Sequence, residues 1–119
     1  MPMKKEPRKE NSLSERERLD GSLRLLSLRE QVSQGTIGKA YLWKERLMQD
    51  VQKVLSDLAP NGVGSQQEFL ELLDKAVLQV DKEQRRATTS ESEMIDIEHT
   101  LNMIQRTLKM VPYQVYFSS

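Results

Sequence analysis

The sequence predicts an all-α protein: an up-down antiparallel bundle of three long helices plus a shorter leading helix, preceded by a disordered tail. Three observations support this prediction. Hydrophobic residues recur at alternating steps of three and four over most of the chain. Signals that start and stop helices separate these stretches at short intervals. The period-two alternation typical of strands is confined to the last few residues.

The first segment, residues 1–12, is predicted to be a disordered basic tail. It contains two prolines and four basic residues, and after Met3 it has nothing to bury. The basic residues could form a weak nuclear-import or phosphate-binding patch. Two glutamates among them dilute the positive charge, so we favour a plain solvated tail.

A helical pattern follows over residues 13–34. Three leucines share one face and three further apolar residues extend it on the flank: Leu19, Leu23 and Leu26, then Leu25, Leu28 and Val32. Two starts are possible, a capping box at Ser14 and Glu17 and a second start around Gly21 and Ser22. A glycine inside a helix costs about 1 kcal/mol relative to alanine, so we predict that the stronger helix begins at Ser22.

The second pattern, over residues 36–58, is joined to the first by a predicted hinge or loop at Gly35 and Gly38. Its apolar arc is wider than the seam of a two-stranded coiled coil, which favours a helix that contacts two neighbours. Trp43 lies at the edge of this arc and Leu42 is out of phase with it. Residues 59–64 contain a proline and two glycines and predict a turn.

Two further long helices are predicted, each with a capping box. The third starts at Ser65 and Glu68 and runs to about Arg86; its inward side chains are Phe69, Leu70, Leu72, Leu73, Ala76, Val77 and Val80, while Leu78 is out of phase. The fourth starts at Ser90, covers residues 91–111 and stops before Pro112. Its core seam consists of six residues, namely Met94, Ile97, Leu101, Ile104, Leu108 and Val111. Short linkers between long helices make neighbours antiparallel, so residues 13–111 are expected to form one bundle domain.

The last segment, residues 112–119, is an aromatic tail. Tyr113, Tyr116 and Phe117 are three of the six aromatic residues in the chain. The tail could pack over the open end of its own bundle, which we favour modestly. Alternatively, it could be an extended segment offered to the groove or sheet edge of a partner.

Composition excludes several classes of function. The 18 basic and 18 acidic residues balance, so no global field attracts nucleic acid or an anionic membrane. The absence of cysteine excludes disulfides and thiolate metal sites. No apolar run approaches the roughly 20 residues of a membrane span, and no signal peptide is evident. We therefore expect an intracellular protein, cytoplasmic or nuclear, with no membrane partner.

Motifs for catalysis are equally scarce. The stretch 35–40 has a superficial phosphate-loop appearance but lacks the glycine spacing, the hydroxyl after the lysine and the preceding strand. His99 is the only histidine and has no nucleophile spaced to work with it. The acidic residues at the start of the fourth helix are explained by the helix dipole. We predict no enzymatic activity and expect no cofactor, no metal and no small-molecule substrate.

The linker between the third and fourth helices contains possible phosphorylation sites. Arg85 and Arg86 precede Thr88 at the spacing that basophilic kinases select, and Ser90 precedes acidic residues. A phosphate here would lie beside a helix N-terminus, where free amide groups favour anions. The alternative is a loop whose hydroxyl groups simply cap the helix.

The remaining hydrophobic residues predict a surface for a partner protein. Outside the core seam of the fourth helix, a methionine-rich stripe runs towards the aromatic tail, and the proposed partner-binding residues are Ile95, His99, Met103, Met110, Tyr113, Tyr116 and Phe117. The partner would be another helical chain, or a second copy through self-association. The leading helix could instead cover this stripe, which would make it part of the core.

The hypothesis that fits best is a non-enzymatic interaction module, a small adaptor or scaffold subunit of a larger assembly. The alternative is a nucleic-acid-associated factor that uses the basic tail together with Arg85 and Arg86, although zero net charge argues against it. A third possibility, an enzyme built on carboxylates, would require a deep polar pocket that amphipathic helices do not obviously provide.

Overall fold

The structure, a computed structural model, describes residues 13–33 and 39–118. For residues 39–42 it describes the backbone only. The described residues form five helices and no strand, which confirms the all-α prediction: α1 (Glu15–Ser33), α2 (Lys39–Leu58), α3 (Gln66–Ala87), α4 (Glu91–Lys109) and α5 (Tyr113–Ser118). The predictions for residues 1–12, for the hinge at Gly35 and Gly38 and for the side chain of Leu42 lie outside the described parts.

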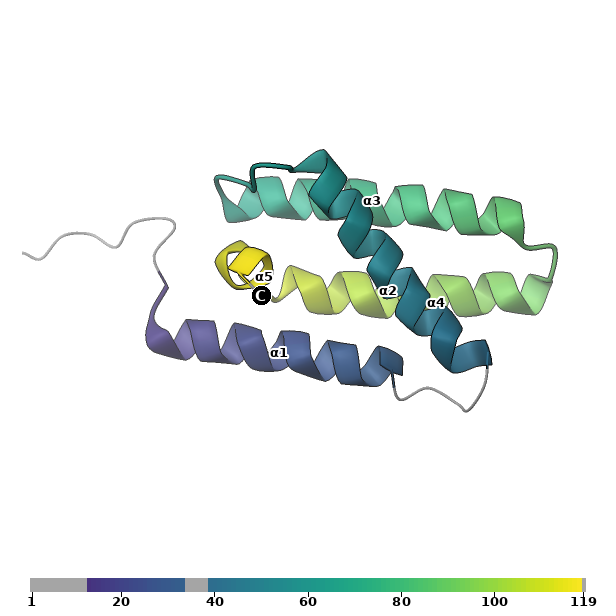
Figure 1. The fold of residues 1–119 in the computed structure, drawn as a ribbon, viewed down its shortest axis with the longest axis horizontal. Helices are drawn as coiled ribbons and strands as arrows, with labels where there is room; N and C mark the ends of the chain where they lie inside the picture. Colours follow the sequence, from purple (N-terminus) through teal and green to yellow (C-terminus); the bar gives the residue numbers. More distant parts are fainter. Residues whose placement is uncertain (1–12, 34–38, 119) are drawn as a thin grey trace, which may run out of the picture.

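Three of the helices lie nearly parallel in one layer, and one crosses them. In Figure 1, α3 and α4 form an antiparallel hairpin, α1 runs along the other side of α4, and α2 crosses diagonally over this layer. The leading helix is only slightly shorter than α2 and α3, since α1 and α4 each contain 19 residues, α2 contains 20 and α3 contains 22. The short α5 turns back at the end of α4 and contacts α1.

Helix α1 starts at the first of the two predicted positions. The backbone N–H of Ser14 donates to Glu17 Oε1 at 3.0 Å, and the N–H of Glu17 donates to Ser14 Oγ at 3.1 Å. This reciprocal capping box satisfies two backbone donors at the helix start. The predicted start at Ser22 is therefore wrong, because the helix passes through Gly21 without interruption.

Gly21 is buried where the chain beyond α4 crosses α1. A Cβ atom at this position would lie 2.7 Å from Pro112 Cδ and 3.3 Å from Val115 Cγ2. Pro112 Cδ belongs to a rigid ring, so it cannot move aside cheaply. The glycine permits a close approach between α1 and the start of α5 and does not mark a helix break.

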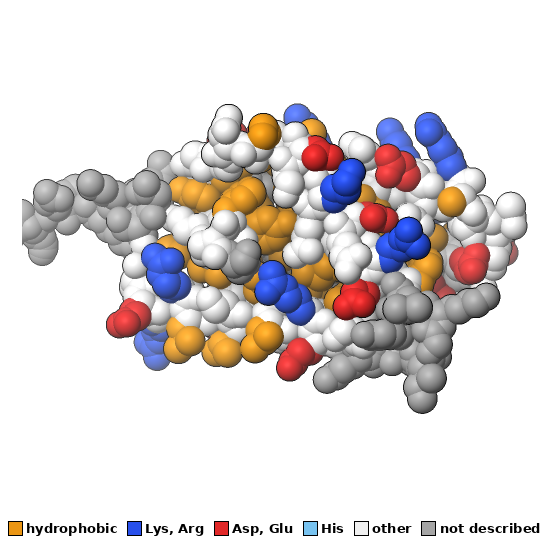
Figure 2. Space-filling view, in the orientation of Figure 1, with side chains coloured by type: hydrophobic (Ala, Val, Ile, Leu, Met, Phe, Trp, Pro, Cys, Tyr) orange, Lys and Arg blue, Asp and Glu red, His pale blue; other side chains and the backbone are white. Residues whose placement is uncertain are grey.

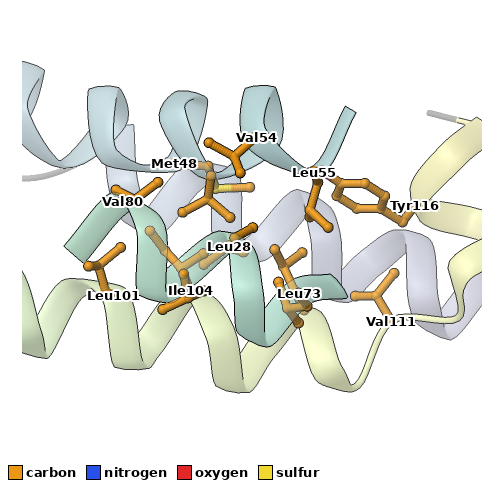
Figure 3. Close-up of a cluster of buried hydrophobic side chains, with 14 of the residues drawn as sticks. Leu28, Met48, Val54, Leu55, Leu73, Val80, Leu101, Ile104, Val111 and Tyr116 are labelled. Atoms are coloured by element: carbon orange, nitrogen blue, oxygen red, sulfur yellow. The ribbon is translucent and has the colours of Figure 1, made fainter. Parts of the chain in front are cut away.

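The core is formed by side chains from all five helices. Figure 3 shows Leu28, Met48, Leu73, Ile104 and other labelled side chains meeting between the helices. α1 contributes Leu25, Leu28 and Val32, each at most 2% exposed. Leu19, Leu23 and Leu26, which were predicted to share one face of this helix, are exposed instead.

Helices α3 and α4 agree closely with the sequence. Ser65 and Ser90 cap them, each accepting an N–H from the residue three positions later. The buried residues of α3 are Phe69, Leu73, Ala76, Val77 and Val80. The predicted core seam of α4 is buried as well, apart from Met94, whose side chain is half-buried. In the turn before α3, Gly62 has a φ of 79°, a conformation that suits glycine.

The aromatic segment after Pro112 folds against its own bundle as α5. Phe69 contacts both rings, with centroids 5.3 Å from Tyr116 and 5.9 Å from Phe117. The Tyr113 backbone N–H donates to Gln66 Oε1 at 2.9 Å, and the Tyr113 hydroxyl donates to the Gly64 carbonyl at 3.3 Å. These contacts fasten the end of the chain to the start of α3.

Candidate interaction surface

The methionine-rich stripe predicted on α4 is exposed only in part. Ile95 and Met110 are 53% and 56% exposed, but they lie near opposite ends of the helix. His99 is also exposed, whereas Met103 is half-buried and packs against the core. Isolated exposed hydrophobic residues are ordinary on protein surfaces, so the α4 stripe is not a continuous apolar patch.

The predicted aromatic contribution to this surface is largely internal. Tyr113 and Tyr116 are buried, and Phe117 is half-buried against the core. Removal from water raises the pKa of the Tyr116 hydroxyl to about 12, while the nearby Arg29 acts in the opposite direction. The aromatic residues thus hold α5 on the bundle and do not form an accessible binding surface in this structure.

The most regular exposed apolar feature lies on α1. Leu19, Leu23 and Leu26 are 61%, 54% and 53% exposed, and their spacing of four and three residues aligns them on one side of the helix. We call these three residues the α1 leucine row. In Figure 2, hydrophobic groups form a row along the outer edge of α1, on the side that faces away from the bundle.

The sequence contained the signal for this row but not its orientation. Apolar residues occupy two roughly opposite sides of α1, the leucine row on one and Leu25, Leu28 and Val32 on the other. Only one side of a helix at the edge of a bundle can face the core. The prediction that Leu25, Leu28 and Val32 lie on the flank of the leucine row is therefore wrong, and the apolar pattern alone does not say which of the two sides faces the core.

Charged side chains border the α1 leucine row. Arg16 precedes Leu19 by three residues and Glu30 follows Leu26 by four, so both continue the line of the leucines, and both are exposed. On one flank, Arg24 Nε lies 3.0 Å from Asp20 Oδ2 in an ion pair one helical turn long. An apolar strip with a charged rim is typical of a surface that binds another protein.

The hairpin end between α3 and α4 contains the predicted phosphorylation sites. Thr88 ends α3 in an extended backbone conformation, and its hydroxyl donates to Glu93 Oε1. Ser90 caps α4 and its Oγ also lies 3.2 Å from Ser92 Oγ. Arg85 Nε lies 3.0 Å from Asp81 Oδ1, and Arg85 Nη2 lies 4.0 Å from Glu98 Oε1, so acidic neighbours already offset its charge.

Carboxylates elsewhere in the described chain do not gather into a group that could bind a metal ion. The pKa of Asp50 is raised above its usual value, mainly because the carboxyl group is partly buried, and the nearby Arg46 opposes this effect. Asp50 accepts a hydrogen bond from Gln84 Nε2 at 3.3 Å, which links α2 to α3. No group of three or more His, Asp or Glu residues in the described ranges is placed to hold a metal ion.

None of the described helices combines the length and the apolar character that crossing a membrane requires. Comparison of the chain with protein-family models, curated proteins and solved structures gives no match.

Proposed function

We propose that the protein is a non-enzymatic helical interaction module, a small adaptor or scaffold subunit of an intracellular assembly. It binds another helical chain through the α1 leucine row. The observation that carries this proposal is the alignment of Leu19, Leu23 and Leu26, each more than half exposed, on a capped helix. Full burial of a leucine contributes roughly 1.5–3 kcal/mol, so covering three half-exposed leucines would favour association by a few kcal/mol.

The spacing of the row suits a helical partner. Side chains four and three residues apart form the ridge that packs into the groove of a second helix. An amphipathic helix laid along α1 would bury the leucines and place its own charged residues near Arg16 and Glu30. The row lies opposite the α1 core face, so binding would not require the bundle to open.

A photo-reactive amino acid in place of Leu23 tests this proposal in cells. We expect cross-linking to a specific chain, identified by mass spectrometry, whereas the same group at the exposed Lys82 of α3 does not capture that chain. With the purified partner, Leu23→Glu should abolish binding and leave the thermal midpoint within a few degrees of the wild type. Binding that survives Leu23→Glu would contradict the proposal.

Phosphorylation at the hairpin end is a separate proposal. Thr88 is in an extended conformation just after Arg85 and Arg86. This conformation and the two preceding arginines support phosphorylation of the Thr88 hydroxyl by a basophilic kinase. A phosphate at this hydroxyl would replace its hydrogen bond to Glu93 with repulsion between like charges. Incubation of the full chain with such a kinase should modify the wild type and the Thr89→Ala variant but not Thr88→Ala. Equal modification of Thr88→Ala would contradict this site.

The alternative of a nucleic-acid-associated factor is less well supported. Asp81 and Glu98 lie near Arg85 and offset its positive charge at the hairpin end. Net charge is zero over the whole chain. A duplex or single-strand titration in low salt should therefore give at most weak binding, because neutralisation of phosphates dominates such affinities.

A further inference from the structure

We infer that the helix that covers the α1 leucine row is α1 of a second copy of this chain, packed antiparallel about a two-fold axis. This inference rests on the proposed function and names its partner. It draws on the order of residues along the exposed side of α1: Arg16, Leu19, Leu23, Leu26 and Glu30. The three leucines are spaced almost symmetrically about the middle of this series. The two residues at its ends, Arg16 and Glu30, are long side chains of opposite charge.

The apolar part of the row is complementary to itself when the second copy runs in the opposite direction. With the two-fold axis between Ser22 and Leu23, Leu19 of one copy lies opposite Leu26 of the second, and the reverse contact follows from symmetry. The two Leu23 side chains meet beside the axis. The leucines span about 10 Å of helix, so all six would lie in one short, continuous contact.

The charges at the ends select the antiparallel orientation. Arg16 of one copy would lie nearly opposite Glu30 of the second copy, giving two symmetric ion pairs. In a parallel pair, Arg16 would instead face Arg16 and Glu30 would face Glu30. Within the described residues, neither side chain takes part in an ion pair of its own chain that would have to break.

The size of the contact sets the strength of the dimer. Three leucines and two charged residues from each copy fall well below the area of about 1,200 Å² found in stable complexes. The dimer should therefore be reversible and should form only at high protein concentration. Exposed ion pairs are screened by salt, so added salt should weaken the contribution from Arg16 and Glu30.

Sedimentation velocity on the full chain over a wide concentration range tests the inference. The wild type should shift from monomer to dimer, and Leu23→Glu should remain monomeric with an unchanged melting curve. Arg16→Glu should raise the dissociation constant about tenfold, because two attractive pairs become repulsive. The double variant Arg16→Glu, Glu30→Arg should restore the wild-type value, and Lys82→Glu on α3 serves as the matched control.

The antiparallel orientation of the two α1 helices is tested by cross-linking through introduced cysteines. The chain contains no cysteine of its own, so each variant carries a single reactive thiol. A short bis-maleimide should link two copies of the Ser22→Cys variant, because this position lies beside the axis. The Arg16→Cys variant should not be linked, since antiparallel packing places its two copies roughly 20 Å apart along the helix axis. Efficient linkage of Arg16→Cys would indicate a parallel pair and overturn the inference.

The remaining outcomes separate this inference from the proposed function. A wild type that stays monomeric at the highest concentration, or a dimer that persists in Leu23→Glu, overturns the two-fold pairing. If the photo-reactive group at position 23 then captures a different helical chain, the interaction module stands without self-association. If it captures nothing, both proposals fail.

Discussion

The guanidinium group of Arg24 joins α1 to the end of α4 by donating from Nη1 to Met110 Sδ at 3.6 Å. The same side chain is held by Asp20 at 3.0 Å, so the contact is oriented from within α1. Met110 is the C-cap residue of α4, and its backbone N–H donates to the Thr107 carbonyl. A methionine expected to face a partner thus contacts the chain's own leading helix while remaining more than half exposed.

The two methionines of the predicted stripe should respond differently to the same substitution. Met103→Gln places an amide against the core and should lower the free energy of unfolding by about 1–3 kcal/mol. Met110→Gln should change it by no more than about 0.5 kcal/mol, because the side chain is 56% exposed. Urea unfolding measures both values. Equal losses would mean that Met110 is packed as firmly as Met103.

Gly21→Ala should destabilise the fold although alanine favours helices. The added methyl group would meet Pro112 Cδ at 2.7 Å, and overpacking of this kind costs about 1–3 kcal/mol. The gain in helix propensity, about 1 kcal/mol, offsets only part of that cost. We expect a lower thermal midpoint. An increased midpoint would show that α5 does not press on α1 at this glycine.

Ser14→Ala tests where α1 begins. Loss of the capping hydroxyl should cost about 1 kcal/mol, because the Glu17 N–H loses its acceptor. Ser22→Ala, inside the helix and exposed, is the control and should be neutral or slightly stabilising. Chemical denaturation of the two variants distinguishes the possibilities. The opposite order of stability would indicate that Ser22 caps the helix.

Tyr116 should make stability depend on pH in the alkaline range. Burial raises its pKa from the usual value near 10 to about 12, so the folded state retains the proton after the unfolded state has lost it. The contribution is therefore present below pH 10 and is lost as the pH rises through about 12. Thermal melts of the wild type should show this decline, and Tyr116→Phe should reduce it. An identical decline in both proteins would assign it to other groups.

The sequence predicted α3 and α4 well because local signals and core packing agree there. Ser65 and Ser90 both cap, the apolar period is regular, and Pro112 follows the end of α4. The aromatic segment was harder to place. Nothing local to Tyr113 or Tyr116 reveals that Gln66 and Gly64 would hold it, since those partners lie about 50 residues earlier in the chain.

By itself, the amino-acid order determined that this protein is all-α, because steps of three and four residues are compatible only with helices that bury one side. Tertiary structure alone decided which side of α1 is buried. Both sides carry leucines, but only the side with Gly21 admits Pro112 and Val115 at close range. That fit turns Leu25, Leu28 and Val32 inward and leaves Leu19, Leu23 and Leu26 in solvent.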